Sequence, residues 1–190
     1  SKTQQSLKNY SKSTSDLVIA LAINPLDESY LSFRKRLISI LIYDSYKAER
    51  NVKLTEALRL VNFSLQLNPY HIKSLRRRSY VYIAKRQIRQ AKQDMDKAIE
   101  LDPSDYDSYK GMDDVLLMER RFEEIAAYWG KYIALKPNDS RAFFERAGTY
   151  YHMKRIDLAV KDAQHAVKLG HPNAAEELRY YKAVLIGKAK

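Results

Sequence analysis

Apolar residues along most of the chain recur three and four positions apart, the spacing that places them on one face of an α-helix. The clearest such stretches come in pairs, at 72–84 with 88–100, 106–118 with 122–134, and 141–152 with 156–168. Only short links separate the two members of each pair. Paired helices joined in this way must pack antiparallel, so the pattern predicts a series of helical hairpins.

The hairpins recur at one fixed interval of 34 residues. The phrase "LNP" at 67–69 returns as "LDP" at 101–103 and as "LKP" at 135–137, and each proline follows a predicted helix end. "SD" at 104–105 and "NDS" at 138–140 supply side-chain oxygens that can cap the next helix. Small residues share two columns of the second helices, which allows a close approach of helix axes: Ala57, Ser64, Ala91, Ala98, Ala159 and Ala166.

The period, the paired helices, the small-residue columns and the closing prolines resemble the tetratricopeptide repeat family. The copy at 142–169 is the most similar. The copy that begins at Tyr106 departs most, because Ile125 and Tyr132 occupy the small columns and Asp113 stands where a small residue is usual. The resemblance implies an all-α fold, a right-handed α-α superhelix (TPR solenoid), with about four repeats, an N-terminal half repeat and a C-terminal closing helix.

The expected organisation is a flexible segment at 1–12 followed by one solenoid domain at 13–190. The repeats are expected at about 28–71, 72–105, 106–139 and 140–173, with the closing helix at 173–187. The first copy is ten residues too long, and we place the surplus at 43–53, as a longer first helix or a longer loop.

Charged residues pair between columns that lie sixteen positions apart. Arg78 is followed by Asp94 and Arg146 by Asp162, whereas the intervening copy has Met112 and Tyr128. We therefore expect these columns to meet inside each hairpin, where an Arg–carboxylate pair fixes the two helices. The alternative is that Arg78 or Arg146 holds a carboxylate of a ligand.

Composition argues against catalysis and against a bound cofactor. There is no Cys, the four His residues lack metal-ligand spacing, and only five Gly residues are available for a phosphate-binding loop. No motif of an activated nucleophile occurs either. We therefore expect no enzyme, no cofactor, no metal site and no membrane insertion, and we expect a cytoplasmic protein.

The tetratricopeptide resemblance implies that first helices line a concave groove that holds a partner peptide or protein. The columns that line this groove in the family include, in this sequence, Ser29, Ser32, Ile83, Asp107, Leu117 and Gly148. The residues that we expect to contact the partner are Arg36, Lys73, Arg76, Tyr80, Lys110, Asp114, Arg141, Phe144, Tyr151 and His152. Cations interleaved with aromatic rings favour a partner with acidic and apolar residues.

Two other functions are compatible with the sequence. The net charge is +11, and residues 72–100 hold nine basic and three acidic side chains, which is compatible with non-specific nucleic-acid binding. The densest cation cluster of that region is formed by eight of them: Lys73, Arg76, Arg77, Arg78, Lys85, Arg86, Arg89 and Lys92. The other possibility is self-association through an exposed apolar helix face near the N-terminal half repeat.

Overall fold

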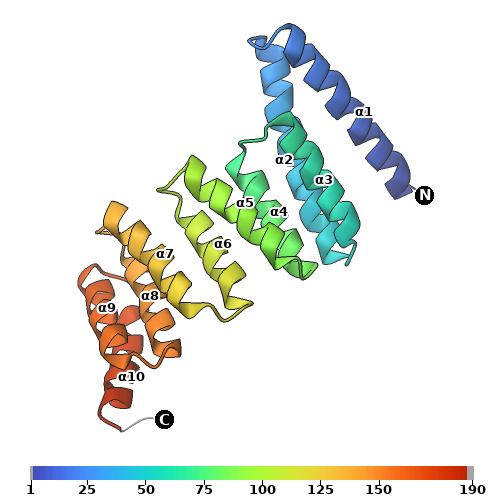
Figure 1. Ribbon diagram of the computed structural model, residues 1–190. Helices are drawn as coiled ribbons and strands as arrows, with labels where there is room; N and C mark the ends of the chain where they lie inside the picture. The colour runs from blue at the N-terminus through green and yellow to red at the C-terminus, as the bar shows by residue number, and fades with distance from the viewer. Residues whose placement is uncertain (1, 188–190) are drawn as a thin grey trace. The chain divides into compact units, whose positions relative to one another are not determined.

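A computed structural model describes residues 2–187, and all of the regular secondary structure in this range is helical. The chain divides into two compact units, at 1–101 and 102–190. Unit 1 holds α1 (Lys2–Ile23), α2 (Glu28–Arg50), α3 (Leu54–Leu67), α4 (Ile72–Ala84) and α5 (Ile88–Leu101) (Figure 1). Unit 2 holds α6 (Tyr106–Leu117), α7 (Phe122–Leu135), α8 (Ser140–His152), α9 (Ile156–Lys168) and α10 (Ala174–Leu185). The all-α class is confirmed, while a single solenoid domain over 13–190 stays a prediction.

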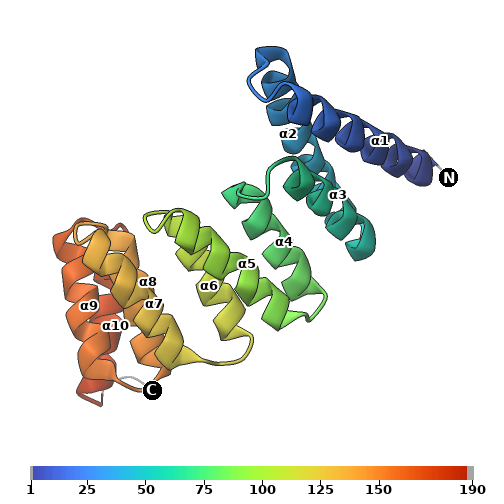
Figure 2. The ribbon, with the colours of Figure 1, turned by 45° about the horizontal axis from the view of Figure 1, so that its top comes forward.

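The helices keep the predicted period of 34 residues. The first helices α4, α6, α8 and α10 begin at Ile72, Tyr106, Ser140 and Ala174. The second helices α3, α5, α7 and α9 begin at Leu54, Ile88, Phe122 and Ile156. Asp105 and Asp139 cap α6 and α8, as expected, because their carboxylates accept backbone N–H groups of the first turn. In Figure 2, α8, α9 and α10 of unit 2 lie side by side.

Each hairpin turn contains one residue in the left-handed conformation, and these residues also recur every 34 positions. They are Val52, Arg86, Arg120 and Lys154, with φ between 56° and 60°. At the first turn the N–H of Val52 donates to Glu49 O, and the N–H of Lys53 donates to Ala48 O. This pair of bonds is the Schellman motif, which closes the end of a helix and reverses the chain.

The turns correct the register of the first copy. Counting back 34 residues from Ile72 gives residue 38, so the ten surplus residues are 28–37, at the start of α2, and not 43–53. The equivalent of Lys73 is then Ser39, and Arg36 lies on the extension of α2, outside the repeat columns. Residues 2–12, for which we expected a flexible segment, form the first turns of α1; residue 1 lies outside the described range.

The small-residue columns are fully buried. Ala57, Ala91, Ala98, Ala159 and Ala166 each expose 0% of their surface. Because no side chain longer than a methyl group intervenes, the second helices approach their neighbours closely at these points.

The α6–α7 hairpin fills the same columns with larger residues. Ile125 and Tyr132 are buried, and the Tyr132 ring lies 5.0 Å from the Tyr109 ring and 6.0 Å from the Trp129 ring. The Trp129 indole N–H donates to the buried Asp113 carboxylate at 3.0 Å. Asp113 therefore stands in a usually small position because it has a hydrogen-bond donor across the hairpin.

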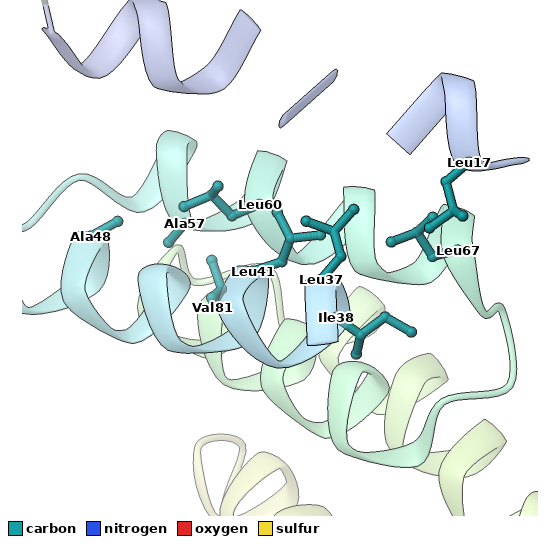
Figure 3. Close-up of a cluster of buried hydrophobic side chains, with 9 residues drawn as sticks. All are labelled: Leu17, Leu37, Ile38, Leu41, Ala48, Ala57, Leu60, Leu67 and Val81. Carbon is teal, nitrogen blue, oxygen red and sulfur yellow. The ribbon is translucent and has the colours of Figure 1, made fainter. Parts of the chain in front are cut away.

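Unit 1 has a core that ties α1 to the first complete hairpin. Leu17 of α1 lies beside Leu67 of α3, and Leu37 and Leu41 of α2 pack in the same cluster (Figure 3). Val81 of α4 completes it. Hence α1 packs as the second helix of a preceding half repeat, in agreement with the N-terminal half repeat that the resemblance implies.

The predicted charge pairs form inside the hairpins. The Arg78 Nε and Nη2 atoms lie 2.8 and 2.7 Å from the Asp94 carboxylate oxygens, and Arg146 makes the same two contacts with Asp162 at 2.6 and 3.0 Å. Arg78 Nη1 also donates to Asn62. These arginines are engaged within the protein, which agrees with the structural interpretation and not with the ligand-binding alternative.

Replacing Arg78 with alanine should destabilise unit 1. The change leaves the nearly buried Asp94 carboxylate without its two charge-assisted bonds, so we expect the free energy of unfolding to fall by about 3 kcal/mol. Urea denaturation followed by circular dichroism measures this change. The matched control is Arg89→Ala, at an exposed position on α5. Unfolding curves of Arg78→Ala and Arg89→Ala that coincide would show that the pair contributes nothing.

Replacing Val52 with glycine should stabilise the protein. Val52 combines a left-handed backbone with a β-branched side chain that is 82% exposed, so the change relieves strain and sacrifices little packing. We expect a gain of about 1 kcal/mol in the free energy of unfolding. The same urea titration measures it, with Arg86→Gly as the comparison at an unbranched residue. A decrease for Val52→Gly would contradict the assigned turn conformation.

Candidate partner-binding surfaces

The predicted partner-contacting residues of unit 1 are accessible. Arg36 and Lys73 are exposed, and Arg76 and Tyr80 are partly exposed on α4. The guanidinium of Arg76 and the ring of Tyr80 therefore reach the surface, although both also interact within the protein. Of the four, Lys73, Arg76 and Tyr80 share a helix, whereas Arg36 lies on the extension of α2.

Arg77, the residue between Arg76 and Arg78, has a purely internal role. Its side chain is 2% exposed, its guanidinium donates to Ser45 Oγ, Ser45 O and Glu49, and it lies 3.9 Å from the centre of the Tyr46 ring. It thereby fastens α4 to the C-terminal half of α2. Arg77, Arg78 and Lys92 of the dense basic segment are engaged with carboxylates, which interrupts the series of cations along it.

Lys110 of α6 lies among carboxylates. Its ammonium group is 3.2 Å from Glu145 of α8, 3.6 Å from Asp113 and 3.7 Å from Asp114. Burial acts to lower the pKa of Lys110, but the three carboxylates outweigh it and the pKa is raised. Glu145 also accepts from the Tyr106 hydroxyl at 2.9 Å. Lys110 and Asp114, both predicted to touch a partner, therefore already form an ion pair within the protein.

Arg141 of α8 is similarly engaged. Its guanidinium binds both oxygens of Asp139 at 2.9 and 2.7 Å and lies 4.0 Å from the centre of the Tyr106 ring. These bonds hold the pKa of Asp139 below its ordinary value. The side chain of Arg141 remains about half exposed, so it can contact a partner only through the side that faces away from Asp139.

The remaining predicted residues lie on α8 and contact three different neighbours, namely α7, α10 and the loop before α10. The Phe144 ring stacks on His171 at 4.1 Å, and His152 stacks on Phe122 at 5.5 Å. The Tyr151 hydroxyl lies 2.8 Å from the Tyr180 hydroxyl. Phe144 thus contacts the loop before α10, whereas the rings of Tyr151 and His152 contact each other at 5.9 Å.

A hollow of about 440 Å³ lies beside these rings. Its lining combines α8 with α10: Gly148, Tyr151, His152, Glu176, Glu177, Tyr180 and Tyr181. Sequence reasoning identified the α8 residues but missed the contribution of α10, because it treated α10 only as a closing helix. The signal was present, since α10 begins 34 residues after α8 and therefore occupies the position of a first helix.

Neither a metal site nor a membrane-spanning helix is found within the described part of the chain. No group of three or more His, Cys, Asp or Glu side chains there could hold a metal ion. No helix in residues 2–187 combines the length and apolar character needed to cross a bilayer. The cytoplasmic location stays a prediction.

Comparison with known proteins supports a repeat architecture. A family model of the tetratricopeptide repeat matches residues 73–105. A search of curated proteins finds no match.

Solved structures share the fold at low sequence identity. PilF of Pseudomonas aeruginosa is 16% identical with a TM-score of 0.62, over 83% of this chain and 78% of that protein. MamA from Desulfovibrio magneticus RS-1, from residue 41 to its end, is 17% identical with a TM-score of 0.56, over 81% and 98%. YrrB, described as a tetratricopeptide repeat protein with an unusual peptide-binding site, is 17% identical with a TM-score of 0.55, over 90% and 84%. One repeat of the chain, at 73–105, thus matches the tetratricopeptide family in sequence, and the chain shares its fold with these solved structures.

Proposed function

We propose that the chain is an interaction scaffold whose first helices bind a segment of a partner protein. The observation that carries this proposal is a difference between the first and second helices of the hairpins. Second helices bury their small residues against neighbours, whereas first helices present partly exposed cations and aromatic rings and, in unit 2, border a hollow. Aromatic anchors beside charged groups are the usual composition of a protein-binding surface.

An acidic and apolar partner segment suits unit 1 best. Lys73 and Arg36 are exposed, and Tyr80 offers a ring beside Arg76. A carboxylate of the partner gains from these cations, and an apolar side chain gains from the ring. A peptide-binding site described for YrrB, which shares the fold, agrees with this class of function.

Selection from a displayed peptide library tests the proposal. We expect the protein to select peptides that combine Asp or Glu with apolar residues, and we expect Arg36→Glu with Lys73→Glu to weaken their binding at least tenfold in fluorescence anisotropy. The control is Arg89→Glu with Lys161→Glu, which makes the same charge change at exposed positions of second helices.

If the two double variants weaken peptide binding equally, the binding depends only on the net charge of the protein. Failure to select any peptide above background would refute the scaffold proposal itself.

Self-association is a second candidate, supported by exposed apolar residues around the α1–α2 turn. Ile23 and Leu26 are 80% and 81% exposed, Ile19 is 59% exposed, and Phe33 is 46% exposed. Phe33 belongs to the ten-residue extension of α2. Exposed apolar side chains of this size favour contact with a second apolar surface, here that of another copy.

Sedimentation of the protein over a range of concentrations tests self-association. We expect a concentration-dependent dimer that Ile23→Asp with Leu26→Asp abolishes. Val52→Asp, which replaces an equally exposed apolar residue on a different turn, should leave the dimer intact. A protein that sediments as a monomer throughout would exclude this candidate.

A further inference from the structure

The hollow between α8 and α10 differs in charge from the rest of the protein. The chain as a whole carries a net charge of +11, yet the charged residues that line the hollow are Glu176 and Glu177. Both stand in the first turn of α10, where the carboxylates also benefit from the helix dipole. An acidic segment that suits unit 1 would be repelled here.

Three tyrosine rings form one wall of the hollow. The Tyr151 ring stacks on the Tyr181 ring at 5.1 Å with an interplanar angle of 21°, and it lies 5.6 Å from the Tyr180 ring. The hydroxyls of Tyr151 and Tyr180 share a hydrogen bond, and the Tyr181 hydroxyl is bonded to Glu177. These two bonds engage two of the three hydroxyl protons, and the wall offers ring faces and hydroxyl oxygen acceptors to a ligand, which attract cations.

The chain itself shows that this wall accepts a cation. The ammonium group of Lys154, in the α8–α9 turn, lies 5.6 Å from the centre of the Tyr151 ring. A ligand cation at the hollow would meet the same kind of ring face together with two carboxylates, so the attraction there is stronger than at the lysine.

Gly148 leaves the room that a long side chain needs. It lies one helical turn before Tyr151 and His152, and a Cβ atom added at this position would meet no atom within 4 Å. The hollow measures about 440 Å³, a size that suits a small ligand group.

We propose that the hollow between α8 and α10 binds a Lys or Arg side chain of the partner, with its charged head between the tyrosine rings and the carboxylates of Glu176 and Glu177. This inference builds on the proposed scaffold function and assigns one subsite within it.

Small probes test the subsite without any partner. Acetyl-arginine amide and its neutral isostere acetyl-citrulline amide are titrated into the ¹⁵N-labelled protein, and amide shifts are followed by NMR. We expect millimolar binding of the arginine probe, shifts at Gly148, Tyr151 and Tyr180, and at least tenfold weaker binding of the citrulline probe.

Two variants locate the binding and identify its cause. Gly148→Leu fills the hollow while favouring the helix, so it should abolish the shifts and leave the far-ultraviolet spectrum unchanged. Glu176→Gln with Glu177→Gln should reduce the preference for arginine over citrulline to about twofold. The control is Glu123→Gln with Asp157→Asn, which removes two first-turn acids from α7 and α9 and should preserve the preference.

Equal affinity for the two probes in the wild-type protein would overturn the inference, as would a Gly148→Leu protein that binds arginine like the wild type. These outcomes do not depend on peptide selection. The subsite can therefore fail while the scaffold function stands, and the scaffold function can fail while the subsite stands.

Discussion

Two helices approach closely only where the side chains between their axes are small, and this constraint organises the α4–α5 and α8–α9 hairpins. Ala91 and Ala98 in α5, and Ala159 and Ala166 in α9, have no exposed surface at all. A helix held this closely has little freedom to rotate, so the residues on the opposite side of its partner have a fixed orientation. The orientation of the exposed residues on the first helices therefore depends on the buried alanines of the second helices.

Polar pairs then fix how the two helices of a hairpin meet. The Arg78–Asp94 and Arg146–Asp162 pairs join equivalent positions of α4–α5 and α8–α9. The α6–α7 hairpin lacks this pair and instead bonds Asp113 to Trp129. Different chemistry thus fastens the same fold, and all of these groups face the inside of a hairpin. What remains for recognition is the set of first-helix residues that no internal bond requires.

The sequence sufficed for the fold because its signals are local or periodic. Helix starts, caps and the sixteen-residue pairing of Arg with Asp all follow from spacing along the chain. The register of the first copy does not follow from such spacing. Its marker is the left-handed backbone at Val52, and no glycine reveals that position. Contacts between first helices were also out of reach. That Lys110 meets Glu145 and that Arg141 lies over Tyr106 depend on how α8 lies against α6, for which the sequence contains no simple rule.

Net charge is therefore a poor guide to what such a scaffold binds. A cation that is held by a neighbouring carboxylate must break that contact before it can bind a ligand. Exchanging the internal carboxylate for one of the ligand gains little binding free energy. In unit 2, Lys110, Arg141 and Arg146 are held in this way, so the basic excess of the chain is not available at their positions. The hollow beside α10 has the opposite composition, since its lining holds the carboxylates of Glu176 and Glu177 and the tyrosine rings near which Lys154 lies. The charge that a surface offers to a ligand is therefore set by which side chains folding has already paired, and not by the net charge of the chain.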